Sequence, residues 1–223
     1  MNTTKNTVTV RPRNEGDPEP DLTLFLVIHR AMRGEVRRLA ALTAEQGGAP
    51  FPPAREAALQ RMLAFLSTTI RVHHTEEDTI LWPVVTASAG AAVDLLPLTE
   101  DHGEIDPYLE RIRTTTGRTR AEALASLRDL LDEHITEEEG DVFPVILRYV
   151  SAEDFAECQK RFQKEAALSQ LRYVVPLIAH YADPAELAHL LKKAGPAMRV
   201  LLRLSRSGYE KLQREVYGVT RPA

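Results

Sequence analysis

The segment HHTEEDTILWPVV, residues 73–85, recurs later in the chain as HITEEEGDVFPVI, residues 134–146. The two copies share six of thirteen residues, and in each a His is followed four positions later by a Glu. Residues four apart lie on one face of an α-helix, with Cβ atoms about 5–6 Å apart. His73 with Glu77, and His134 with Glu138, are therefore spaced to bind metal from one helix face. A duplicated pair predicts a site with approximate two-fold symmetry, such as two metal ions held between helices.

Apolar residues recur at helical spacing around both copies and in two further segments. We expect four helices, at about residues 21–46, 53–88, 95–115 and 119–150, joined by short polar turns. His29 falls in phase with the apolar stripe of the first segment, and His102 with that of the third. The predicted fold is all-α, an antiparallel up-down-up-down four-helix bundle with additional C-terminal helices.

Six residues with metal-binding side chains fall on the predicted core faces. They are His29, His73, Glu77, His102, His134 and Glu138. A single His on an apolar face is more often a core residue than a ligand. A buried charged Glu, however, is costly unless it is paired or bound to a cation. Two such glutamates among four histidines favour metal binding, and imidazole plus carboxylate without thiolate suits iron, zinc or manganese.

This series of a His, a His-x3-Glu, a His and a second His-x3-Glu resembles the hemerythrin-like (HHE cation-binding) family over about residues 21–150. The resemblance implies a non-haem centre of two iron ions, bridged by carboxylates and by an oxo or hydroxo group. It implies metal ligation by the same six residues: His29, His73, Glu77, His102, His134 and Glu138. The ligand or substrate would be a small molecule, namely dioxygen, hydrogen peroxide or nitric oxide.

The chain departs from the oxygen-carrying hemerythrins four residues after His102, where the carriers place a second His. Here that residue is Asp106, which is followed by Pro107. Asp106 or the flanking His74 are further candidate ligands, although adjacent helical residues such as His73 and His74 point about 100° apart. Coordination positions left open would favour redox chemistry, such as catalase-like, peroxidase-like or NO/O2-reactive activity. The alternative is a non-catalytic protein that binds, stores or senses oxygen or iron. A zinc or manganese hydrolase is a third reading, but no substrate-binding element supports it.

The terminal regions, the net charge and the cysteine content give further expectations. Residues 1–20 are polar and Pro-rich and predict a disordered arm, and residues 151–223 predict a helical extension that packs on the bundle or forms a homodimer. His180 and His189 have no Glu at ligand spacing and stay outside the predicted site. A net charge of -4 argues against a nucleic-acid partner. Without a membrane-length apolar run, a signal peptide or a second cysteine beside Cys158, we expect a cytoplasmic protein.

Overall fold

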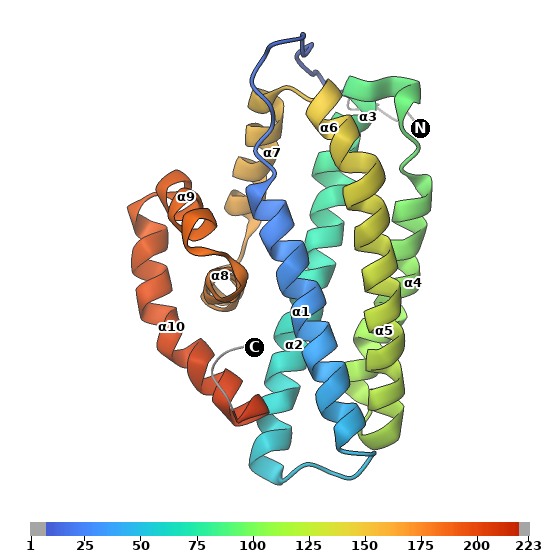
Figure 1. Cartoon of the computed structure of the whole chain (residues 1–223), viewed down its shortest axis with the longest axis vertical. Helices are drawn as coiled ribbons and strands as arrows, with labels where there is room; N and C mark the ends of the chain where they lie inside the picture. Colours follow the sequence, from blue (N-terminus) through green and yellow to red (C-terminus); the bar gives the residue numbers. More distant parts are fainter. Residues whose placement is uncertain (1–7, 219–223) are drawn as a thin grey trace, which may run out of the picture.

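The computed structural model describes residues 8–218, and its regular structure is entirely helical, with no strand among those residues. Four long helical segments lie side by side, and the colours in Figure 1 show each segment running back along its predecessor. Their elements are α1 (Thr23–Glu45), α2 (Pro53–Glu76) with η1 (Glu77–Leu81) and α3 (Trp82–Ala89), α4 (Leu96–Thr114), and α5 (Gly117–Glu137) with η3 (Glu138–Val142) and α6 (Phe143–Tyr149). These bounds agree closely with the four predicted helices.

The second and fourth segments each contain a π-helical turn, and each turn begins at a repeated glutamate. In η1 the Trp82 N–H donates to the Glu77 carbonyl, and in η3 the Phe143 N–H donates to the Glu138 carbonyl. Pro83 or Pro144 follows at once. Proline has no N–H, and in an α-helix its ring clashes with the carbonyl four residues earlier. The widened turn accommodates each proline, so the helix continues beyond it as α3 or α6.

The apolar core forms two layers, one on each side of the repeated histidines. The larger layer includes Met32, Ile70, Ile105 and Leu131. The smaller layer includes Phe25, Ile80, Leu98 and Val142. In each of the four segments, a histidine falls in sequence between a member of one layer and a member of the other. The apolar stripes therefore fix the helices above and below a polar section of the bundle.

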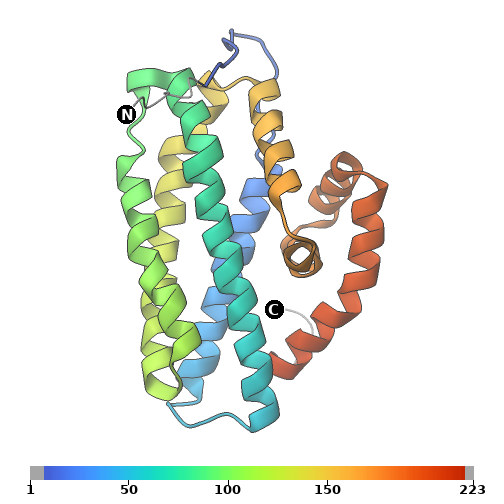
Figure 2. The same cartoon turned by 180° about the vertical axis from the view of Figure 1, so that it is seen from behind.

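Four further helices follow the bundle. They are α7 (Ala152–Glu165), α8 (Leu168–Tyr181), α9 (Pro184–Ala194) and α10 (Pro196–Tyr217). The Ser151 hydroxyl caps α7 by accepting from the Asp154 N–H, and Asp183 caps α9 in the same way. Helix α7 contacts η1, α8 contacts α1 and α2, and α10 contacts α2 and α8. Figure 2 shows α8, α9 and α10 on one side of the four long segments.

The part of the predicted arm that the structure describes, residues 8–20, contains no helix, and residues 1–7 lie outside the described range. The Arg11 guanidinium forms ion pairs with Glu153 and Asp154 at the start of α7. Residues 8–20 are thus connected to the C-terminal extension through Arg11. Among residues 8–218, no helix combines the length and apolarity needed to cross a membrane.

Candidate metal centre

The polar section of the bundle brings together seven buried side chains from the four long segments. They are His29 on α1; His73, His74 and Glu77 on α2 and η1; His102 on α4; and His134 and Glu138 on α5 and η3. The six predicted residues are all among them, and His74 is the seventh. Their donor atoms form two groups, in each of which the atoms lie within 4.8 Å of one another.

The first group consists of His29, His73, Glu77 and Glu138. The Nε2 atoms of His29 and His73 lie 2.9 Å apart. His29 Nε2 lies 3.3 Å from a Glu138 oxygen, and His73 Nε2 lies 2.9 Å from a Glu77 oxygen. Two imidazole nitrogens and two carboxylates thus converge on one point from three helical segments.

The second group consists of His74, Glu77, His102 and His134. The rings of His74 and His102 stack with their centroids 4.1 Å apart, and the His134 ring meets both of them edge-on. His102 Nε2 lies 3.6 Å from the Glu77 oxygen that does not face His73. Glu77 therefore belongs to both groups, with one oxygen toward each.

Polar atoms in this section are buried without hydrogen-bond partners. Among residues 8–218 no partner satisfies Nε2 of His74, His102 or His134, nor either carboxylate oxygen of Glu77 and Glu138. Burying such groups unpaired costs several kcal/mol, roughly 2–7 kcal/mol for a neutral one. Bound cations would satisfy all of these atoms, so the donor set fits metal ions better than it fits a packed core.

Carboxylates outside the two groups hold three of the imidazole rings. The Nδ1–H of His29 donates to Glu139 at 3.0 Å, and that of His102 donates to Asp78 at 3.0 Å. His134 Nδ1 lies 3.4 Å from Asp101. Holding Nδ1 in this way turns Nε2 toward the centre and fixes the tautomer that binds metal.

Burial sets the protonation states of these groups. Removal from water lowers the pKa of His73 and of His134 to about 3, so both imidazoles are neutral at pH 7. The same desolvation raises the pKa of Glu77 and of Glu138 well above the usual range. Neutral imidazole is the form that ligates a metal, whereas the two carboxyls must lose their protons to solvent when a cation binds.

One known protein-family domain matches the part of the chain that holds the candidate centre. The hemerythrin HHE cation binding domain matches residues 21–146, more than half of the chain. The chain belongs to the hemerythrin HHE family. Comparison with curated proteins and with solved structures gave no match. The matched range covers all seven residues of the two groups, so the HHE domain contains the whole candidate centre.

Two candidate ligands left open by the sequence have different positions in the HHE domain. His74 lies in the second group. Asp106 lies on the surface, where its carboxylate accepts from the Arg71 Nε–H at 3.0 Å, and Pro107 lies inside α4 without ending it.

His189 pairs with Asp21, and His180 lies against the rings of Tyr181 and Tyr209. Neither of these two histidines belongs to a metal-binding group among the described residues.

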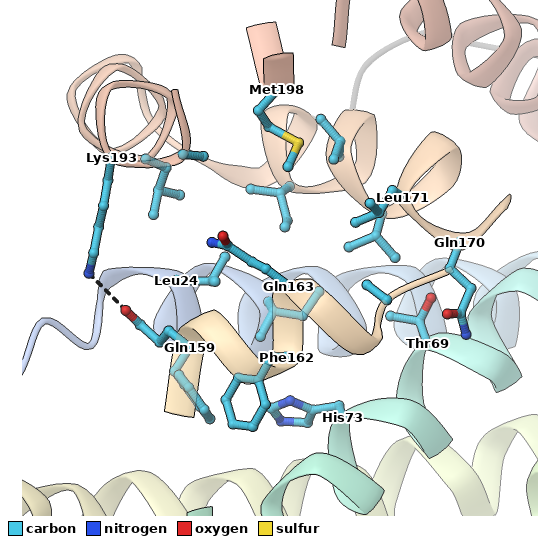
Figure 3. Close-up of a pocket in the computed structure, with 18 of the residues that line it drawn as sticks. Leu24, Thr69, His73, Gln159, Phe162, Gln163, Gln170, Leu171, Lys193 and Met198 are labelled. Atoms are coloured by element: carbon cyan, nitrogen blue, oxygen red, sulfur yellow. Dashed lines mark hydrogen bonds between the residues drawn. The ribbon is translucent and has the colours of Figure 1, made fainter. Parts of the chain in front are cut away.

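Two cavities border histidines of the two groups. A polar cavity of about 200 Å³ borders His134, and its lining includes four carboxyl groups, from Asp101, Glu104, Glu133 and Glu137. An apolar cavity of about 210 Å³ borders His73 and lies between the bundle and the C-terminal helices (Figure 3). Each group thus has one histidine at the wall of a cavity.

Proposed function

We propose that this chain is a non-haem di-iron protein that reacts with a small oxidant, such as hydrogen peroxide, dioxygen or nitric oxide. The antiparallel up-down-up-down bundle inferred for residues 21–150 would hold the two ions. The observation that carries the proposal is the position of Glu77, whose two oxygens face different groups of histidines. A carboxylate shared in this way suits two adjacent cations.

The donor chemistry supports iron. Each group offers imidazole and carboxylate donors, and none of them is a thiolate. Cys158, the one cysteine, lies buried against the Ile80 carbonyl and belongs to neither group. Imidazole with carboxylate suits non-haem iron, whereas structural zinc usually has four ligands that include cysteine. Such an iron pair supplies redox chemistry and a Lewis acid for small oxygen-containing molecules.

The coordination positions that the protein leaves open on each ion favour a reaction over oxygen or iron storage. Each group offers four protein ligands, and an octahedral ion takes about six. Each ion therefore keeps roughly two positions for an oxygen bridge and an exogenous molecule. A position open to peroxide would allow its disproportionation to water and dioxygen, which needs no further reductant.

His74 is the observation in favour of the alternative function, reversible binding of oxygen or iron. It brings the number of histidines in the two groups to five, which closes one position that the predicted set of four would leave open. Exposure of the reduced protein to air distinguishes the proposed reaction from reversible binding. We expect lasting oxidation and consumption of added peroxide. A spectral change that reverses through repeated deoxygenation, without peroxide consumption, would instead establish the binding protein.

Metal content tests the centre itself. Protein purified with adequate iron should contain about two ions per chain and absorb in the near ultraviolet. Glu77→Ala should lose at least one ion, because Glu77 belongs to both groups. Glu137→Ala is the matched control, since Glu137 is exposed and adjoins Glu138 without belonging to either group. Two ions retained in folded Glu77→Ala protein would refute the shared carboxylate.

A further inference from the structure

The apolar cavity beside His73 is built jointly by the bundle and by the C-terminal extension. Its lining comes from α1, α2, α7, α8, α9 and α10. Figure 3 shows Phe162 of α7 beside His73, with Leu171 of α8 and Met198 of α10 across the opening. The last four helices lie beyond the matched range 21–146. The cavity is therefore a property of this chain's extension as much as of its HHE domain.

Charge around the cavity disfavours an ionised ligand. Apart from His73, the ionisable side chains in its lining are Glu76 and Lys193. The Lys193 ammonium already donates to Gln159 at 2.8 Å and to the Asp21 carboxylate at 2.9 Å. The Asp21 carboxylate already offsets the charge of Lys193, so a ligand carboxylate would gain little from Lys193, and Glu76 would repel it when ionised. A neutral molecule avoids that repulsion.

The volume of the cavity limits the size of its occupant. A protein cavity of roughly 150 Å³ lined by Leu, Ile and Phe binds benzene. The present cavity, at about 210 Å³, has room for a larger molecule of two fused rings or a short branched chain. The cavity thus suits a small molecule of that size.

We propose that this cavity binds a neutral, mainly apolar small molecule of about two fused rings. Bound there, the molecule would lie against Phe162 and His73, and so in contact with a histidine of the first metal-binding group. Gln163 and Gln170, which also line the cavity, offer amide groups for a hydroxyl or carbonyl on the ligand. The binding site needs no metal, so it can be tested apart from the proposed iron chemistry.

Calorimetric titration of the full chain with 2-naphthol, a neutral two-ring probe, tests the site directly. We expect saturable binding at one site per chain. Met198→Trp should weaken it at least tenfold by filling the cavity. Val200→Trp should not change it, because Val200 lies on the same helix, is 58 % exposed and does not line the cavity. Binding of equal strength in Met198→Trp protein would overturn the site. Octanoate should bind more weakly than 2-naphthol, and tighter octanoate binding would overturn the neutral class.

A second measurement locates the probe in the unsubstituted chain. With methyl-labelled methionine, 2-naphthol should shift the methyl resonance of Met198, which lines the cavity. The methyl resonances of Met32 and Met62 should stay in place, because both side chains are fully buried in the larger core layer and neither lines the cavity. Shifts at Met32 or Met62 with none at Met198 would place the probe elsewhere and refute the proposal.

Discussion

His73 and His74 are neighbours in sequence, yet each belongs to a different group of donors. Adjacent residues of a helix point about 100° apart. That angle would prevent both from binding one ion, but it suits two ions on either side of Glu77. His73 turns toward His29 of α1, and His74 stacks on His102 of α4. The second repeat has Ile135 at the equivalent position, so the duplication in the sequence gives no hint of the seventh residue.

Substitution of the two alternative ligands should separate their roles. His74→Ala should reduce the metal content or speed peroxide turnover, because it removes one of four donors from the second group. Asp106→Ala should leave both unchanged, since its carboxylate pairs with Arg71 at the surface. Metal analysis and peroxide assays on both variants provide the check. Loss of metal from Asp106→Ala alone would show that the second group is assigned wrongly.

Proton release should accompany metal binding. Burial raises the pKa of Glu77 and of Glu138, so below those raised values each carboxyl of the metal-free fold keeps its proton. The unfolded chain loses these protons near the usual glutamate pKa. The stability of the metal-free fold that these two carboxyls provide is therefore full at low pH and is lost as pH rises toward the raised pKa values.

Metal affinity should accordingly increase with pH, by up to about tenfold per pH unit for each proton released. The measurement is Tm with and without iron in a non-chelating buffer from pH 5.5 to pH 8. The gap between the two Tm values should widen toward pH 8. A gap that is constant over this range would show that neither carboxyl loses a proton to solvent when the metal binds.

The sequence predicts the core-facing position of residues on the apolar helix stripe. It does not predict the contacts of residues outside that stripe. The apolar stripe places His29, His73, His102 and His134 on the core side, and the structure brings them together with Glu77 and Glu138. Their role as metal ligands stays a prediction. The carboxylates that hold the imidazoles, Asp78, Glu139 and Asp101, fall outside that stripe. Their contacts depend on side-chain positions across different helices.

Among the helical elements, each π-helical turn joins a glutamate of the candidate centre, Glu77 or Glu138, to a proline. From the sequence, Pro83 and Pro144 are each consistent with either a kink or a fraying helix end. The structure shows each proline in the first turn of the helix that follows η1 or η3. A π turn adds one residue to the helical repeat, and such turns often occur at functional sites. Helical periodicity alone cannot reveal an extra residue of this kind.

The contact between α1 and α8 depends on a residue without a side chain. A Cβ atom at Gly34 would overlap the Tyr181 ring. Gly34→Ala should therefore lower the free energy of unfolding by about 1–3 kcal/mol through overpacking. Gly208→Ala is the control, because Gly208 lies inside α10 with nothing near its added Cβ. It should stabilise by about 0.5–1 kcal/mol. Urea unfolding of both variants measures the difference, and equal stability would contradict the close approach.

The extension is joined to the bundle by a buried polar cluster around Glu35 of α1. One Glu35 oxygen accepts from the Tyr181 hydroxyl at 2.9 Å and from Arg38 at 2.9 Å, and the other accepts from the Tyr217 hydroxyl at 3.1 Å. Gln213 of α10 donates to the same carboxylate at 3.2 Å. Two helices of the extension thus share one buried charge with the bundle. A homodimer through these helices stays a prediction.

Removing that charge should loosen the extension without emptying the metal centre. Glu35→Ala leaves a largely buried Arg38 guanidinium and two tyrosine hydroxyls without their acceptor, which should cost about 3 kcal/mol. Glu215→Ala is the control, since it breaks the exposed pair of Glu215 with Arg61 that also joins α10 to α2, and it should cost less than about 1 kcal/mol.

Hydrogen exchange would show which helices lose stability in Glu35→Ala protein. In Glu35→Ala protein the amides of α8 and α10 should exchange faster, because these helices supply Tyr181, Gln213 and Tyr217. The amides of α5, which has no residue in the cluster, should keep their protection, and iron content should match that of the unsubstituted chain. The apolar cavity needs α8 and α10 in place, so 2-naphthol binding should weaken in the same variant. Unchanged exchange in α8 and α10 would mean that apolar packing alone holds the extension.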